Sequence, residues 1–146
     1  MTGTSMDGID ISLVKTNGID LIRYNENFFY EYSSETKKFL LNLIKEDVNV
    51  NLSRQKILDE IITKEHFFAL KDLRITKKAD LLGFHGQTIY HDSKNKISIQ
   101  LGNPEMLSKM LNKNVISDFR IKDIQMGGEG APLAPIYHKF IIQNLK

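Results

Sequence analysis

The sequence predicts an α/β fold in which a mixed sheet is covered by helices. Three observations predict it: apolar residues alternate with period two near the start of the chain, they fall at helical spacing between residues 33 and 69, and strand-like and helix-like segments alternate from residue 79 onward. A strand-rich beginning followed by alternating strands and helices is typical of a single mixed domain.

The composition agrees with one soluble domain and excludes several classes of protein. The 146 residues are 41% hydrophobic and 26% charged, and the formal net charge is +2. The basic residues form no stripe with interleaved aromatic residues, so we expect no nucleic-acid partner. No apolar run approaches the length of a membrane span, so we expect no membrane partner. Cysteine is absent, which excludes disulfides and thiolate catalysis and suits a cytoplasmic protein.

The first part of the chain is expected to form antiparallel strands. Residues 9–13 place alternate apolar side chains on one face of a strand. Asn17-Gly18 is typical of a two-residue hairpin turn, and residues 19–32 are rich in β-forming side chains. We expect a further bend of the sheet around residues 25–27, so that this part forms an antiparallel meander.

Two helices are expected next, because apolar side chains recur at helical spacing in residues 39–44 and 57–69. Ser33, Ser34 and Ser53 are candidate caps for their first turns.

Strands and helices alternate in the second half of the chain. Strands are expected at residues 81–84, 97–101 and 115–120. A helix is expected to begin at Pro104, with Asn103 as its capping residue, and a last helix is expected to begin at Pro135.

The first candidate functional cluster is the turn at the start of the chain. It combines glycines, hydroxyls and carboxylates in eight residues: Gly3, Thr4, Ser5, Met6, Asp7, Gly8, Ile9 and Asp10. Glycines let backbone N–H groups approach a phosphate closely, and a carboxylate beside a phosphate is tolerable mainly when a divalent cation lies between them. The turn therefore predicts a bound nucleotide with magnesium, and an ordinary hairpin turn is the alternative.

The second cluster, Gly83-Phe84-His85-Gly86-Gln87-Thr88, stands at the end of a predicted strand. An imidazole and an amide side chain can hold the hydroxyls of a sugar or orient a water, and the flanking glycines leave room for a ligand. The alternative is a bend at a strand end with a satisfied histidine.

Two further clusters lie in the last third of the chain. Asp118 and Arg120 share one face if they lie on a strand, where they could bind a polyol and a carboxylate, although an ion pair within the strand explains the spacing equally well. The loop Gly127-Gly128-Glu129-Gly130-Ala131-Pro132 is rich in glycine, which is typical of close backbone approach to a ligand or of a mobile surface loop.

Taken in order, these clusters resemble the anhydro-N-acetylmuramic acid kinase family. Residues 1–10 resemble the family's opening M-S-G-T-S-x-D-G-x-D, with Thr2 in place of the usual serine. Residues 83–91, 100–104 and 118–133 resemble its later blocks, and Glu129 stands where the family often has glutamine. The resemblance therefore extends across the whole chain.

The resemblance implies an actin-like, sugar-kinase ATPase fold of the ribonuclease H-like type, with two domains around a nucleotide cleft. It implies an enzyme that hydrolytically opens 1,6-anhydro-N-acetylmuramic acid and transfers the γ-phosphate of ATP to O6, which gives N-acetylmuramic acid 6-phosphate for peptidoglycan recycling. The cofactors it implies are ATP and Mg²⁺. A homodimer is a further candidate assembly.

The resemblance also implies roles for single residues. The turn from Gly3 to Asp10 would hold the ATP phosphates, and Asp7 or Asp10 would reach the magnesium ion directly or through water. The candidate sugar contacts are Gln87, Asp118, Arg120 and Gly128.

Two departures from the family pattern shape the expected domain organisation. The family has a strand ahead of its opening block, whereas Met1 lies inside that block here. Family members are also much longer, so we expect residues 1–146 to be an N-terminal actin-like ATPase subdomain without the first strand and the C-terminal domain. The family's general base would lie beyond Lys146, so no catalytic residue is assigned in this chain. The alternatives are a non-catalytic remnant that binds sugar or phosphate weakly, and a different actin-like sugar kinase.

Overall fold

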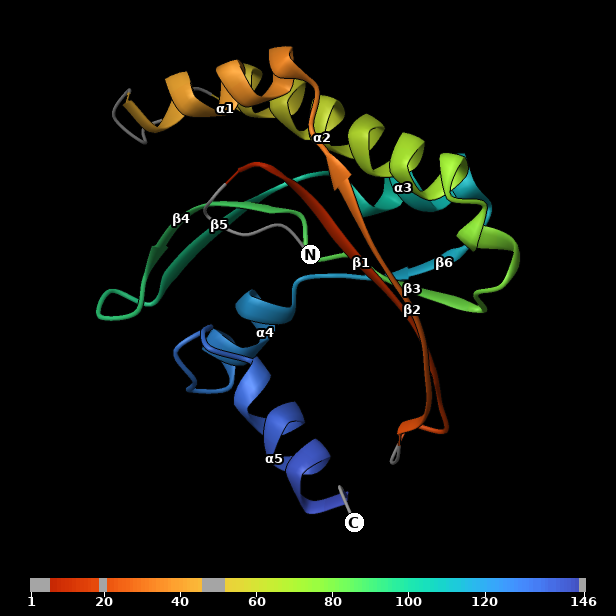
Figure 1. Cartoon of the computed structure of the whole chain (residues 1–146). Coiled ribbons are helices and arrows are strands. Elements are labelled where there is room, and N and C mark those ends of the chain that lie inside the picture. Colours follow the sequence, from red (N-terminus) through yellow and green to blue (C-terminus); the bar gives the residue numbers. More distant parts are fainter. Residues whose placement is uncertain (1–5, 19–20, 46–51, 145–146) are drawn as a thin grey trace.

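Pairs of strands form the centre of the structure, and helices lie on two sides of them (Figure 1). The structure is a computed structural model that describes residues 6–18, 21–45 and 52–144. Helices α1, α2 and α3 lie on one side of the strands, and α4 and α5 lie on the other. The expected mixed α/β class is confirmed, but the described strands form three two-stranded sheets instead of one continuous sheet.

The first sheet is an antiparallel hairpin of β1 (Gly8–Thr16) and β2 (Leu21–Glu31). The expected hairpin is confirmed, but the two-residue turn is wrong, because Thr16 pairs with Leu21 and four residues connect the strands. The expected bend around residues 25–27 is instead a bulge within one continuous strand. Leu13 pairs with Glu26 and Val14 with Tyr24, so that one extra residue of β2 bends the hairpin without ending it.

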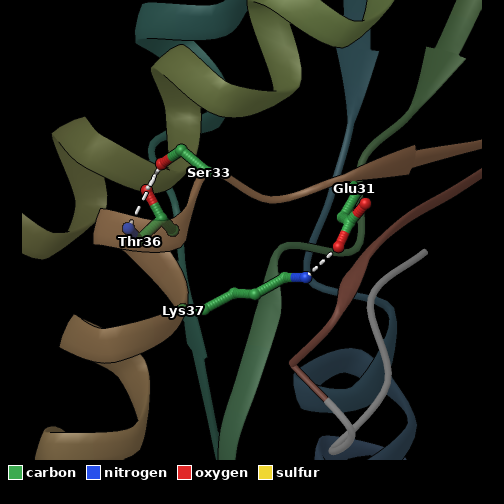
Figure 2. A network of polar contacts seen from close by, with 4 residues as sticks. All are labelled: Glu31, Ser33, Thr36 and Lys37. Carbon is green, nitrogen blue, oxygen red and sulfur yellow. Dashed lines mark hydrogen bonds and ion pairs between the residues drawn. The ribbon is translucent and has the colours of Figure 1, made fainter.

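Helix α1 (Ser34–Lys45) follows β2, and Tyr32 and Ser33 connect the two elements. The Ser33 hydroxyl accepts a hydrogen bond from the Thr36 backbone N–H at 3.2 Å, which confirms Ser33 as the capping side chain. Lys37 on the first turn of α1 forms an ion pair with Glu31 at the end of β2, as Figure 2 shows. The ion pair joins the first turn of the helix to the end of the strand that precedes it.

Helix α2 (Leu52–Asp72) is the longest element, and a short 3₁₀ helix, η1 (Ile75–Lys77), follows it. Within the described ranges, no helix is both long and apolar enough to cross a membrane. The main core lies where α1 and α2 cover the strands, and it contains Met6, Ile9, Tyr32, Leu40, Leu43, Leu58, Ile62, Ala69 and Leu101.

The second sheet is a parallel pair of short strands, β3 (Leu81–Gly83) and β6 (Asn114–Ile116). Helix α3 (Pro104–Leu111) precedes β6 and packs against both α2 and β6. The expected start of α3 is confirmed, because the Asn103 side chain accepts a hydrogen bond from the Met106 N–H at 2.8 Å.

The third sheet is an antiparallel hairpin of β4 (Gln87–Asp92) and β5 (Ile97–Leu101). The sequence predicts β5 but not β4, whose residues are mainly polar. The Asp92 carboxylate accepts hydrogen bonds from the backbone N–H groups of Lys94 and Asn95, at 3.0 and 3.1 Å, and this closes the turn between the two strands.

The expected strand at residues 115–120 is wrong beyond Ile116. Asp118 has φ 61°, which ends the extended backbone, and helix α4 (Phe119–Gln125) begins immediately after it. The last helix, α5 (Ala134–Asn144), begins within one residue of the expected position.

Candidate functional site

The opening turn is described only from Met6 onward, so the predicted phosphate contacts at Gly3, Thr4 and Ser5 lie outside the described residues. Met6 has φ 55° and its side chain is buried. The Asp7 carbonyl accepts a hydrogen bond from the Tyr32 N–H at 3.0 Å. The turn is therefore anchored to the far end of β2.

Gly8 is required by close packing against β2. A Cβ atom at this position would lie 2.4 Å from the Tyr30 carbonyl oxygen and 2.7 Å from the Phe29 ring, and real Cβ atoms do not approach so closely. The first strand can therefore lie against β2 at this point only if residue 8 is glycine.

Asp7 and Asp10 are both exposed. Asp10 lies on β1, whereas Asp7 lies in the bend that precedes this strand. Within the described residues, no three potential metal-binding side chains gather in one place.

His85 and Arg120 meet between β3 and α4. The Arg120 Nε–H donates a hydrogen bond to His85 Nε2 at 2.8 Å. His85 Nδ1 lies 2.9 Å from the Gly86 carbonyl oxygen, which can only accept, so the proton of the ring is on Nδ1 and the histidine is neutral. Burial lowers the pKa of His85, the bond to Gly86 opposes this effect, and the charge of Arg120 lowers the pKa further.

Arg120 also reaches toward the glycine-rich loop that follows α4. Its Nη1 lies 3.5 Å from the Gly130 carbonyl oxygen. One helical turn later, the Asp123 carboxylate accepts a hydrogen bond from the Gly130 N–H at 2.8 Å. Lys96, which directly precedes β5, donates a hydrogen bond from its Nζ to the Gly128 carbonyl oxygen at 2.7 Å. The loop is therefore held by side chains at several points.

Asp123 and Lys96 were missed by the sequence analysis. Asp123 follows Arg120 by three residues, which places both on one face of a helix. The prediction of a strand here gave no reason to group the two residues. Lys96 has no local signal, because its partner Gly128 is 32 residues away.

Asp118 and Arg120 do not share the face of a strand. Asp118 is exposed in the turn before α4, where its carboxylate accepts a hydrogen bond from the Ser117 hydroxyl at 3.0 Å. Arg120 is in the first turn of α4 and is partly buried. No ion pair joins the two among the contacts of the described residues, so the alternative of an intrastrand ion pair is also wrong.

Gln87 is fully buried, with no exposed side-chain surface. Its Oε1 accepts a hydrogen bond from the Tyr32 hydroxyl at 3.1 Å, and its Nε2 donates to the Thr88 carbonyl oxygen at 3.0 Å. In this arrangement Gln87 connects β4 to the end of β2 inside the core, and it presents no surface to a ligand.

A cleft of about 910 Å³ separates β1 from β3. Asp10 on β1, His85 at the end of β3 and Phe119 on α4 all line it. Most of its wall is apolar and includes Ile9, Ile11, Leu13, Leu70, Ile75 and Phe84. The cleft therefore connects the strand of the opening turn with the residues around Arg120.

Comparison with known proteins gives one consistent family. The family model described as "Anhydro-N-acetylmuramic acid kinase" matches residues 1–146. A protein of that name from Pelagibacter ubique is 38% identical over 154 residues, which covers 100% of this chain and 41% of the relative. Relatives of the same name from Bradyrhizobium diazoefficiens and Rhodopseudomonas palustris are each 32% identical, and this chain covers 42% of each. The chain thus spans about two-fifths of the length of these curated relatives.

Proposed function

Because the chain belongs to the anhydro-N-acetylmuramic acid kinase family, we propose that it is the N-terminal portion of an enzyme that opens 1,6-anhydro-N-acetylmuramic acid hydrolytically and phosphorylates O6. The product is N-acetylmuramic acid 6-phosphate, and the reaction serves peptidoglycan recycling in the cytoplasm. The observation that supports the proposal most strongly is the family match over all 146 residues.

The opening turn is proposed to hold ATP and Mg²⁺. Magnesium is typically bound by one or two carboxylates together with waters and phosphate oxygens, so the exposed carboxylates of Asp7 and Asp10 fit this ion without a third protein side chain. When bound, ATP supplies the phosphoryl group and Mg²⁺ offsets its charge. Gly3 to Ile9 would contribute backbone N–H groups and hydroxyls to the phosphates.

The sugar is proposed to lie beside α4 and the loop after it. Arg120 is a candidate for the carboxylate of the muramic acid, because a guanidinium can bind a carboxylate through two parallel hydrogen bonds. Asp118 is exposed and can accept hydrogen bonds from sugar hydroxyls, and the backbone of Gly128 lies in the tethered loop. Gln87 stays a predicted sugar contact. Because its side chain is buried, we propose that its role is indirect and that it holds the end of β4 in place.

The cleft between β1 and β3 is proposed to take one further strand. The resemblance implies a strand ahead of the opening turn, and the cleft is bounded by one strand from each of two separate sheets. Its apolar wall suits an extended segment with alternate apolar side chains. Such a strand would join the two sheets. The domain with the general base would then complete the enzyme from residues beyond Lys146.

A second candidate is a non-catalytic remnant that binds sugar or phosphate weakly. The chain covers 41% of the length of the Pelagibacter ubique relative. Exposed apolar side chains just after α4 and on α5, such as Met126 at 78% and Ile142 at 69%, are surfaces on which a second copy or another domain could pack.

The proposal is tested by incubating the purified chain with 1,6-anhydro-N-acetylmuramic acid, ATP and Mg²⁺. Calorimetry measures binding of sugar and nucleotide, and chromatography measures ADP and the 6-phosphate. We expect sugar binding that Arg120→Gln weakens at least about tenfold, without turnover. Turnover by the chain alone would contradict the assignment of the general base to a segment beyond Lys146. Weak binding of sugar or nucleotide, or none, would favour the remnant.

A further inference from the structure

Arg120 is a partly buried cation that no acidic side chain neutralises among the described residues. The nearest acidic residue on the same face of α4, Asp123, accepts from the Gly130 N–H instead. Burial lowers the pKa of Arg120, which agrees with the absence of a compensating charge. A partly buried charge without an ionic partner costs free energy unless something else binds it.

The one side-chain partner that the described contacts give Arg120 is the neutral ring of His85. The Nε–H of Arg120 points at His85 Nε2, 2.8 Å away, and the opposite side of the ring is fixed by the Gly86 carbonyl oxygen at 2.9 Å. A carboxylate in the place of His85 would fix the guanidinium equally well but would cancel its charge. A neutral acceptor fixes the orientation and leaves the full positive charge for an anion.

We propose that His85 is a positioning residue, which holds Arg120 in the orientation that binds the carboxylate of the sugar acid while leaving its charge uncompensated. This inference rests on the proposed function. His85 touches no reacting atom and acts only through Arg120. Within the described part of the chain, the groups that interact electrostatically with His85 are Arg120 on α4 and His66 on α2.

Two substitutions of His85 separate the parts of the contact. The amide of Gln reaches the position of Nε2, so His85→Gln keeps an acceptor for Arg120 that cannot be protonated. The amide of Asn reaches only the position of Nδ1, so His85→Asn keeps a donor for Gly86 and loses the acceptor. His85→Asn is therefore the test variant and His85→Gln is its matched control, and thermal melts of both establish that they fold.

The first measurement needs no ligand. In ¹H–¹⁵N spectra of this chain, we expect a slowly exchanging Arg120 Nε–H signal, assigned by its loss in Arg120→Gln. The signal should persist in His85→Gln and disappear in His85→Asn. A signal unchanged in a folded His85→Asn variant would overturn the positioning role.

The second measurement compares the affinity for 1,6-anhydro-N-acetylmuramic acid with that for its uncharged carboxamide. We expect the acid to bind more tightly, with this preference reduced at least about tenfold in His85→Asn and retained in His85→Gln. Equal preference in the wild type and His85→Asn, or no preference in the wild type, would overturn the inference. If the complete protein has no kinase activity but its preference for the acid still depends on His85, the inference is supported and the kinase proposal is rejected. The failure of one is therefore distinguishable from the failure of the other.

Discussion

The Tyr32 hydroxyl donates a hydrogen bond to Gln87 Oε1 at 3.1 Å, and this contact joins two buried residues that are 55 positions apart. Tyr32 follows β2 and Gln87 begins β4, so the contact links the first hairpin to the third sheet. It also explains why a polar side chain at a glycine-flanked strand end is fully buried.

Tyr32→Phe removes this hydrogen bond and keeps the ring. We expect the free energy of unfolding to fall by about 1 kcal/mol, because a buried acceptor loses one partner. Denaturant unfolding measures the change. In a double-mutant cycle with Gln87→Leu, the effect of Tyr32→Phe should shrink. Equal effects in both backgrounds would show that the contact contributes nothing to stability.

Gly8→Ala should destabilise the hairpin, because the new Cβ would lie 2.4 Å from the Tyr30 carbonyl oxygen. We expect a loss of about 1–3 kcal/mol in the free energy of unfolding. Gly83→Ala is the matched control in a strand, since a Cβ there would lie at an ordinary 3.5 Å from the Phe119 ring. Similar unfolding midpoints for the two variants would contradict the close approach at Gly8.

Protonation of His66 should destabilise the fold in mildly acidic solution. Burial lowers the pKa of His66 from 6.5 to about 4, against the effect of its hydrogen bond to the Ile62 carbonyl oxygen. At neutral pH the ring is uncharged in both the folded and the unfolded chain. As the pH is lowered from 6.5 to 4, the unfolded chain takes up the proton before the folded chain does. The free energy of unfolding therefore decreases over this range, by about 3 kcal/mol in all.

The measurement is denaturant unfolding between pH 7.5 and 4. His66→Phe keeps a ring against Phe84, which lies edge-on to His66 at 4.8 Å, and should have a flatter pH dependence than the wild type. The lowered pKa of His85 acts in the same direction in both proteins, and the raised pKa of Asp59 opposes it. His138→Gln, at an exposed histidine, is the control and should follow the wild type. Parallel curves for wild type and His66→Phe would refute this prediction.

Asp123→Ala should release the glycine-rich loop from α4. The Gly130 N–H loses its acceptor at 2.8 Å, so its hydrogen exchange should accelerate and stability should fall by about 1 kcal/mol. Lys122→Ala, at the exposed neighbouring position, is expected to leave the exchange of Gly130 unchanged. If Gly130 exchanges at the wild-type rate in Asp123→Ala, the loop is held by other contacts.

Much of the fold could be predicted from the sequence where local patterns decide the structure. The alternation at residues 9–13, the capping serine before α1 and the Asn103-Pro104 start of α3 all rest on neighbours within a few residues. The sequence motifs of the family can also be recognised from the sequence, because they are short runs of particular residues in a particular order.

The rest depended on long-range contacts or on an unusual backbone. Nothing local shows that the polar segment Gln87–Asp92 pairs with β5, and its buried amide needs a partner from residue 32. The left-handed conformation of Asp118 is uncommon for a residue other than glycine, so the β-forming side chains around it predict a strand that the structure ends at Ile116. That error concealed the common face of Arg120 and Asp123.

We propose that this chain supplies the sugar-acid and phosphate contacts of a kinase whose general base lies in another segment. The most direct test joins the chain to the remainder of the Pelagibacter ubique relative in place of the segment it matches, and measures transfer of the labelled γ-phosphate of ATP to 1,6-anhydro-N-acetylmuramic acid. We predict phosphorylation by the chimera, none by the 146-residue chain alone, and a loss of at least about tenfold in kcat/KM in the Arg120→Gln chimera. A folded chimera without transfer, or equal kcat/KM in the chimera and its Arg120→Gln variant, would refute this proposal.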